Sequence, residues 1–575
     1  MMAQFLEIKA EHPDALLFYR MGDFYEMFFD DAVAAAAALD IALTKRGQHQ
    51  GADIPMCGVP VHSAEGYLLT LIRKGFRVAI AEQLENPAEA RKRGAKSVVK
   101  RGVVRLVTPG TLTEDSLLEP RRHNFLTAFA QVRDAGALAW ADISTGELRV
   151  MPCPRVRLAP ELSRLAPREM IVLAGSEPDF DELAAEFQLA VSGLSPASFD
   201  STGAAKRLCA VFGVSTLDGF GTFERAELSA LGALVEYLDL TQRGRIPLLR
   251  PPVRESAGAV MQIDAATRRN LELTQAMGGG RDGSLLATID MSATAGGARL
   301  LERRISSPSC DLATIRARLA GVNALVESDL LRGDLRSALR QVPDMDRALS
   351  RLALDRGGPR DLAMLRGGLA GAGQIAGILA AADVPSLLRE AAAALVGHEA
   401  LHARLDAALV ADPPLLARDG GFIAEGVDAE LDEARRLRDE GRGVIAGMQA
   451  EYIAETGINS LKIKHNNVLG YFIETTAAHA GKMLAPPLSE RFIHRQTTAS
   501  QVRFTTLPLS EMETRILNAG GRALEIEKRL FEELRAGVLA QAAPIHTTAR
   551  ALAEVDVAAA LAELARLRDW ARPVV

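Results

Sequence analysis

The sequence predicts a multidomain α+β protein, and three observations support this fold class. The chain has 575 residues, far more than one hydrophobic core usually serves, so we expect about three to five domains. Hydrophobic residues make up 48% of the chain and charged residues 24%, a balance typical of folded globular proteins. The hydrophobic period also changes along the chain, from mixed helix and strand at the start to long helical patterns later.

Charge, cysteine spacing and hydropathy exclude several classes of protein. The net charge is −6, whereas proteins that bind nucleic acid over their whole surface are usually basic; local basic patches still fit this value. The four cysteines form no CxxC pair, so neither a zinc ribbon nor a redox pair is expected. No apolar run approaches the roughly 20 residues of a membrane helix, and the N-terminus does not resemble a signal peptide. We therefore expect a cytoplasmic protein without a membrane segment.

Residues 1–110 predict a first domain of mixed α/β type. Residues 30–39 form an alanine-rich helical pattern, and residues 76–81 form a short buried strand pattern. Between Arg91 and Arg105 lie seven basic residues and no acidic residue. This segment is interpreted either as a solvated loop or as an edge that contacts nucleic-acid phosphates. The turn signal in residues 107–111 ends the domain.

Residues 111–245 predict a second, small α/β domain. Three strand-like runs at 125–132, 137–143 and 147–151 are separated by short turns and indicate a β-meander; one more strand is expected near 170–173. Such a start suggests a ribonuclease H-like sheet. Nucleases of that type need a cluster of carboxylates to hold two metal ions. Asp142 stands nearly alone at the equivalent place, so we interpret this domain as a structural connector.

The remainder predicts a long helical domain that is interrupted by a small β unit. An apolar stripe through residues 427–453 and a second helical pattern at 509–534 indicate two long helices. Between them, strand formers gather at 461–464, 471–476 and 502–506, so we expect a β unit at the tip of a two-helix arm. The predicted segments are 246–452 for the first helical part, 453–508 for the β unit and 509–575 for the second helical part.

Two local motifs match known patterns of enzymes and have simpler interpretations. Residues 278–283 satisfy GxGxxG, but helical residues precede them instead of the strand that a dinucleotide site requires, so we expect a flexible connection. His398 and His402 form a literal HExxH, which on a helix would place two imidazoles on one face, as in zinc proteases. The extended metzincin spacing is absent, and we favour a solvated helix face over the zinc hydrolase that this motif would imply.

Aromatic residues are scarce at 5% of the chain, yet they concentrate in residues 18–29. For Phe18, Tyr25 and Phe28 we favour burial in an aromatic nucleus. The alternative for one member is exposure as a wedge, because an inserted apolar side chain unstacks a base step and kinks the duplex. A weakly paired base is easier to displace, so such a wedge senses mispairing through deformability.

The segment Arg20–Glu26, with its core Phe-x-Glu, resembles the mismatch-binding signature of the bacterial MutS family. The resemblance is highly specific, because further matches follow in the family's order along nearly the whole chain. They are residues 43–47, 54–60 with His62, 81–83, 103–111, 264–272, 470–473 and 495–497. The implied fold is a mixed α/β mismatch-binding domain, a ribonuclease H-like connector and a long all-α core and lever with an inserted β clamp.

The resemblance implies that Phe24 stacks on a mispaired base and that Glu26 hydrogen-bonds that base from the minor groove. A wedge in the minor groove reads groove width and bendability rather than a base code. A carboxylate near phosphates also repels all DNA, which penalises correctly paired duplex unless a displaced base offers a donor.

The resemblance further implies contacts with the DNA backbone and a set of binding partners. The expected backbone contacts are Lys45, Arg46, Lys462, Lys464, Arg495, Gln496 and Arg503. Where the family pattern leads us to expect a lysine and an asparagine after residue 497, this chain has Thr498, Ala499 and Ser500, which weakens the clamp. The expected partners are double-stranded DNA with mispairs or small loops, a second copy of the intact protein and a MutL-type repair protein.

The sequence has no GxxxxGK[ST] motif, and it stops at residue 575, about where the family's ATPase domain should begin. We therefore expect no enzymatic activity and no cofactor in this chain, with ATP and Mg²⁺ bound only by the missing C-terminal domain. Two rival interpretations stay open. One is a family relative that binds branched DNA, which should lack the Phe24–Glu26 pair; the other is the zinc hydrolase on His398 and His402.

Overall fold

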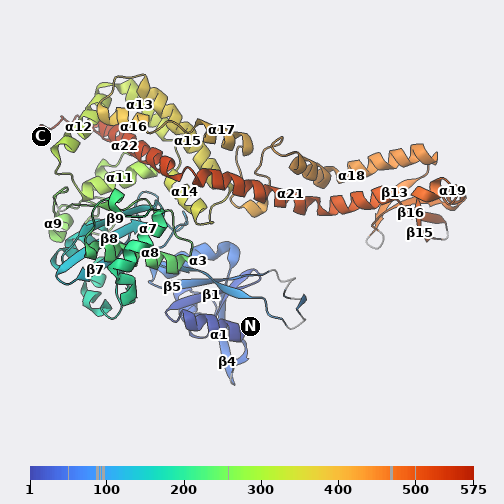
Figure 1. The fold of residues 1–575 in the computed structure, drawn as a ribbon, viewed down its shortest axis with the longest axis horizontal. Helices are drawn as coiled ribbons and strands as arrows, with labels where there is room; N and C mark the ends of the chain where they lie inside the picture. The colour runs from blue at the N-terminus through green and yellow to red at the C-terminus, as the bar shows by residue number, and fades with distance from the viewer. Residues whose placement is uncertain are drawn as a thin grey trace. The chain divides into compact units, whose positions relative to one another are not determined.

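The computed structural model describes residues 1–49, 51–85, 90, 92–93, 97–256, 258–466, 470–498 and 500–575 (Figure 1). Residues 91 and 94–96 of the basic segment, and Ala499 beside the expected clamp contacts, lie outside this description. The chain forms two compact units. The first contains residues 1–357, 364–399 and 539–575, and the second contains residues 358–363 and 400–538.

The first unit begins with a six-stranded sheet in the order β3-β4-β2-β1-β5-β6. β1 and β5 run parallel, and the other neighbours pair antiparallel. The sheet has a core on each face, because residues in β1 and β2 alternate between the two hydrophobic clusters. The elements are α1 Met2–Glu11, β1 Ala15–Met21, β2 Phe24–Phe28, α2 Phe29–Leu39, β3 Thr44–His49, β4 Ala52–Pro60, α3 Ala64–Arg73, β5 Arg77–Gln83 and β6 Arg101–Val107.

A second mixed sheet follows, in the order β11-β10-β7-β8-β9-β12. The predicted meander is confirmed, since β7, β8 and β9 pair antiparallel, while β10 and β11 add in parallel beside β7. The long helix α8 packs on β7 and β8 (Figure 1). The elements are β7 Leu126–Val132, β8 Ala135–Asp142, β9 Glu147–Pro152, α5 Leu158–Leu165, β10 Glu169–Leu173, α6 Asp181–Phe187, β11 Ala190–Leu194, α7 Ser201–Phe212, α8 Arg225–Gln242 and β12 Val253–Arg254.

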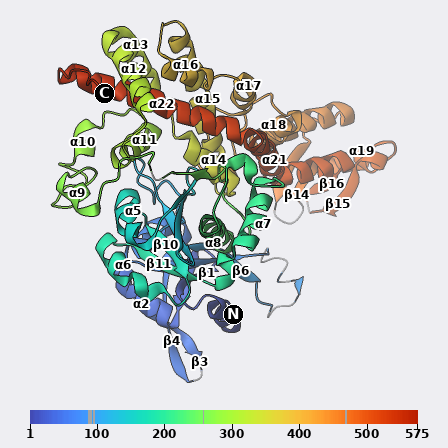
Figure 2. The ribbon, with the colours of Figure 1, turned by 60° about the vertical axis from the view of Figure 1, so that its left-hand side comes forward.

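The helical part of the first unit is built around α22 (Ala542–Leu567), which crosses among α11, α12, α13, α14 and α16 (Figure 2). α22 is buried on several sides, and its small alanines allow close approach of the neighbouring helices. The surrounding elements are α9 Ala265–Asn270, α10 Leu285–Ile289, α11 Ala295–Ser306, α12 Leu312–Glu327, α13 Asp329–Leu339, α14 Met345–Ala353, α15 Pro359–Ala380 and α16 Ser386–Ala393.

α15 corrects one expectation from the sequence. It is long and apolar enough to cross a membrane by length and composition, whereas no apolar run of that size was expected. A buried core helix meets the same criteria, so one such helix is weak support for a membrane span. Leu365, Leu369 and Ile375 of α15 are buried within the protein, which is the packing of a core helix.

The second unit consists of two long helices and a four-stranded antiparallel sheet in the order β13-β14-β16-β15 (Figure 1). Both predicted long helices and all three predicted strands of this region are confirmed, and β15 is an additional strand. Ion pairs such as Arg515–Glu433 and Arg522–Glu430 tie the two helices together. The elements are α17 Glu399–Ala408, α18 Ala429–Thr456, β13 Lys462–Asn466, β14 Gly470–Thr476, α19 Ala477–Met483, α20 Leu488–Arg491, β15 Ile493–Thr497, β16 Gln501–Thr505 and α21 Leu507–Leu539.

Candidate nucleic-acid interface

β2 presents Phe24 and Glu26 on the same face of the first sheet, because side chains two residues apart on a strand point the same way. Phe24 is 47% exposed, whereas Phe18, Tyr25 and Phe28 are buried, as the sequence predicts. Phe28 lies on the same face but is covered by Phe5 of α1, with ring centroids 5.0 Å apart. One aromatic side chain of the cluster is therefore left free to contact a partner.

The turn between β1 and β2 fixes where Phe24 lies. Gly22 has φ +61°, a left-handed conformation that favours glycine at the first position of a two-residue hairpin turn. The Val61 amide donates to the Asp23 carbonyl oxygen at 2.9 Å, which anchors the turn to the end of β4. On the opposite face, Tyr25 packs against Phe18, and burial raises its pKa above the ordinary value for tyrosine. The exposed ring thus stands on a rigid strand.

Glu26 is only 15% exposed and its Oε2 accepts a hydrogen bond from Arg46 Nη1 in an ion pair. Arg46 lies on β3, which is separated from β2 by β4. The pairing of β3 with β4 is irregular between Lys45 and Gln48, and Gly47 within this bulge has φ +69°. A β-bulge changes the direction of a side chain, and here it accompanies the reach of Arg46 across β4.

Lys45 points to a different carboxylate from its neighbour Arg46. Its Nζ lies 2.7 Å from Asp53 Oδ2, and both side chains are well exposed. Both basic residues that were expected to contact the DNA backbone in this domain therefore have an acidic partner in the free protein.

The basic segment between residues 91 and 105 was interpreted as a solvated loop or as a phosphate-contacting edge. Two of its described residues match neither interpretation. Arg101 is buried, and its Nε donates to the Arg20 carbonyl oxygen at 2.7 Å. Arg105 is also buried and forms an ion pair with Glu114. These two guanidiniums hold the domain together and lie in neither a solvated loop nor a phosphate-contacting edge.

In the second unit, three of the expected backbone-contacting residues form one network around Glu474. Lys464 Nζ lies 2.5 Å and Arg503 Nε 3.2 Å from its carboxylate, and Arg503 Nη1 donates to Gln496 Oε1 at 2.9 Å. Glu474 has a side chain only 4% exposed; burial raises its pKa, but the two cations outweigh burial, so that the pKa is lowered overall. The carboxylate is therefore ionised at neutral pH.

Lys462 and Arg495 are exposed on β13 and β15. Among the residues that the structure describes, neither forms an ion pair. These two side chains are the ones most available to a phosphate on this sheet.

Three family models match the chain: MutS domain I over residues 1–116, MutS domain II over residues 124–250 and MutS domain III over residues 266–562. The third model alone covers more than half of the chain. The chain belongs to the MutS family. The resemblance seen in the Phe-x-Glu segment and its followers is thereby confirmed as a family relationship.

Curated relatives agree with this MutS assignment. Proteins named DNA mismatch repair protein MutS are 70% identical in Cereibacter sphaeroides (strain ATCC 17025 / ATH 2.4.3) and 69% identical in Paracoccus denitrificans (strain Pd 1222), in both over 100% of this chain. The relative from Ruegeria pomeroyi is 66% identical over the whole chain. This MutS chain spans about 65% of the length of the relatives from Cereibacter sphaeroides and Paracoccus denitrificans.

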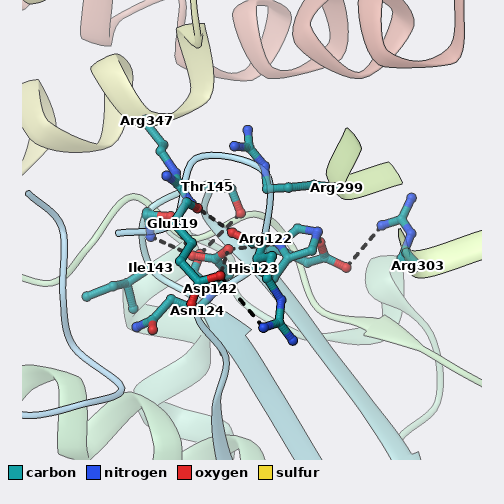
Figure 3. Close-up of polar contacts among 12 residues, drawn as sticks. Glu119, Arg122, His123, Asn124, Asp142, Ile143, Thr145, Arg299, Arg303 and Arg347 are labelled. Carbon is teal, nitrogen blue, oxygen red and sulfur yellow. Dashed lines mark hydrogen bonds and ion pairs between the residues drawn. The ribbon is translucent and has the colours of Figure 1, made fainter. Parts of the chain in front are cut away.

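Within MutS domain II, Asp142 is part of a buried polar junction with the helical part of the same unit (Figure 3). Asp142 Oδ2 lies 2.8 Å from His123 Nδ1, and its Oδ1 accepts from the Ser144 amide at 3.0 Å and the Ser144 hydroxyl at 2.6 Å. Arg347 of α14 donates to the carbonyl oxygens of Glu119 and Arg122, on the segment that carries His123. Asp142 is thus saturated by protein partners, which supports its interpretation as structural.

The zinc-hydrolase interpretation of His398 and His402 does not fit this MutS structure. α17 begins at Glu399, so His398 precedes the helix and the two imidazoles do not share a helical face. His398 is buried, and its Nε2 lies 2.8 Å from Thr548 Oγ1. Within the described ranges, no group of three or more His, Cys, Asp or Glu side chains is placed to hold a metal ion. Residues 278–283 lie in turns without a preceding strand, as expected for a connection.

Sequence reasoning missed the acidic partners of this interface, Asp53, Glu474 and the role of Glu26 toward Arg46. Glu474 lies 10 residues from Lys464 and 29 from Arg503, so only the register of three strands brings them together. The single available signal was the run of strand formers in residues 471–476, because on a strand Glu474 lies on the same face as Phe472.

Proposed function

We propose that this chain recognises mispaired or looped-out bases in double-stranded DNA, as the first step of mismatch repair. The observation that carries the proposal is Phe24, an exposed aromatic ring on a rigid strand, two residues from a carboxylate, in a chain that belongs to the MutS family. Phe24 would insert from the minor groove and stack on the displaced base, and Glu26 would hydrogen-bond that base.

A mispair favours this insertion for energetic reasons. Unstacking a base step costs a few kcal/mol, and a base that is already weakly paired lowers that cost. Discrimination therefore comes from the deformability of the DNA, which fits a single apolar wedge better than an array of base-edge contacts would.

The four-stranded sheet between α18 and α21 would act as a clamp on the DNA backbone, carried by the two helices as a lever. Lys462 and Arg495 are exposed for this role, and Lys464, Gln496 and Arg503 surround Glu474 beside them. The strand order of the second sheet supports the expectation of a ribonuclease H-like connector. We assign homodimer formation, a MutL-type partner and the ATP and Mg²⁺ site to the longer relatives as proposals of the same kind.

The test is fluorescence anisotropy with a labelled duplex that carries one G·T mispair, measured against its fully paired twin. Phe24→Ala should abolish the preference for the mispair while leaving affinity for the paired twin nearly unchanged, because it removes the wedge and no charge. Val156→Ala is the matched control, since Val156 is an 85% exposed apolar side chain in the second sheet's domain.

Two outcomes would count against the proposal. One is a native chain that binds both duplexes equally at about 50 and about 200 mM salt, a range over which phosphate-driven affinity falls steeply. The other is stronger binding of a four-way junction than of the mispaired duplex, which would favour the branched-DNA interpretation instead.

A further inference from the structure

The pair formed by Arg46 and Glu26 joins two residues that the resemblance assigns to different tasks, backbone contact and base recognition. Arg46 Nη1 donates to Glu26 Oε2 in the free protein, with the arginine side chain 40% and the glutamate side chain 15% exposed. A guanidinium bound to a carboxylate cannot give the same hydrogen bond to a phosphate. The contact places Arg46 at the recognition carboxylate itself, whereas the acidic partners of Lys45, Lys464 and Arg503 are Asp53 and Glu474.

The strand between the two partners leaves room for this contact. Glu26 is directly opposite Gly58 of β4, and directly opposite residues project on the same face. A side chain at position 58 would stand beside Glu26, since a Cβ built there lies 3.6 Å from Glu26 Cγ. Met56 lies two residues from Gly58 on β4, on the same face, and its Sδ is 3.9 Å from Arg46 Nη1. Together, the bulge in β3 and the bare position in β4 give the guanidinium access to Glu26.

We propose that Arg46 is a positioning residue for Glu26: it orients the carboxylate toward the displaced base and thereby sets the discrimination between mispaired and paired DNA. This inference rests on the proposed function, because it assigns a role within the same recognition site. A carboxylate held by a guanidinium on one oxygen keeps its second oxygen available to accept a hydrogen bond from a base.

Arg46→Gln separates this role from a phosphate contact. If Arg46 positions Glu26, affinity for the G·T duplex falls about tenfold, as expected when a charge-assisted hydrogen bond loses its geometry. Affinity for the paired twin changes less than about twofold, and the slope of log affinity against log salt stays the same. A phosphate-contacting arginine would instead lower both affinities equally and reduce that slope by about one.

Lys45→Gln is the matched control, because Lys45 precedes Arg46 on β3 and its partner is Asp53 rather than Glu26. It removes the same charge from the same strand. Its effect on the mispaired and the paired duplex should be equal, so that the ratio of the two affinities is unchanged. Arg46→Lys should restore part of the lost ratio, because lysine keeps the charge but lacks the planar, two-pronged geometry of arginine.

A double-variant cycle with Glu26→Gln tests whether Arg46 acts through Glu26. In the Glu26→Gln background, Arg46→Gln should leave the ratio of the two affinities unchanged. The proposal would be overturned if Arg46→Gln lowered the ratio of the two affinities equally with and without the Glu26 carboxylate. It would also be overturned if Arg46→Gln reduced the salt slope and left that ratio unchanged. Failure of the wedge proposal gives a different result. In that case the native chain itself would bind the mispaired and the paired duplex equally.

Discussion

Single residues in this protein take their roles from what surrounds them more than from their type. Phe24 and Phe28 share a strand and a face, yet Phe5 of α1 covers only Phe28. Lys45 and Arg46 are consecutive basic residues, yet one contacts Asp53 and the other Glu26. Motif matching identifies the residues of a site, but not the contact that each of them makes in the free protein.

Asp142 carries a prediction at this scale. Burial raises its pKa, but the hydrogen bond and charge of His123, together with Arg347 and Ser144, outweigh burial and lower the pKa to about 2. A carboxyl with a lowered pKa stabilises the fold above its ordinary value near 4 and loses that contribution as pH falls toward about 2. Asp142→Asn should lower the free energy of unfolding at pH 7 by about 3 kcal/mol, since the buried partners of Asp142 then face no negative charge.

The measurement is denaturant unfolding followed by the fluorescence of Trp140, a buried residue of β8 in the same sheet. The native chain should lose stability between pH 4 and pH 2, and the variant should show a flatter pH dependence across that window. If stability depended on pH equally in the two proteins, the partners of Asp142 would not stabilise its ionised form as the structure implies.

At the scale of elements, β15 shows why one strand of the second unit's sheet was not predicted. All five residues of Ile493–Thr497 are exposed, and their sequence does not alternate between apolar and polar side chains. β15 lies at the edge of its sheet and pairs only with β16. Its strand conformation therefore depends on hydrogen bonding to β16 and not on a hydrophobic pattern of its own. Arg495 and Gln496 were placed in the clamp by family resemblance, without any strand signal of their own.

The Glu474 network gives a prediction for this sheet. Glu474→Gln keeps the shape of the side chain but frees Lys464 and Arg503 from their carboxylate. Affinity for mispaired and paired duplex should rise together, and the salt slope should become steeper, because two more cations become available to phosphates. Glu490→Gln is the control, since Glu490 is an exposed acidic residue in the neighbouring helix α20.

Anisotropy titrations at three salt concentrations measure both quantities. A rise in affinity that is confined to the mispaired duplex would contradict the assignment of Lys464 and Arg503 to the backbone. An equal rise for Glu474→Gln and Glu490→Gln would show that total charge, rather than the network, controls binding.

At the scale of the whole molecule, the helical part of the first unit depends on how closely α11 approaches α22. Asp556 of α22 is buried and accepts hydrogen bonds from the amides of Ala293 and Thr294 at the start of α11. Gly297 makes this possible, because a Cβ at that position would lie 2.1 Å from Asp556 Oδ2.

Two adjacent glycines of α11 test this packing. Gly297→Ala should destabilise the first unit by about 1–3 kcal/mol, since the added methyl group displaces the Asp556 carboxylate. Gly296→Ala is the matched control, because its Cβ would meet ordinary contacts at 3.8 Å or more, and alanine favours a helix by up to about 1 kcal/mol. Urea unfolding curves should therefore shift in opposite directions, and a similar shift for both would contradict the close approach.

In the first sheet, local patterns predicted only a strand at 76–81, and the exposure of one aromatic in residues 18–29 was an alternative that Phe24 meets. Local patterns did predict the α+β class, the meander of the second sheet and the two long helices with strands between them. These features follow from local periodicity and turn chemistry, which act over a few residues. The tertiary structure alone decided that Arg46 pairs with Glu26, that Glu474 joins Lys464 to Arg503 and that His398 lies outside its helix. These contacts depend on strand register and on bulges, and no local pattern in the sequence encodes which distant residue a side chain will meet.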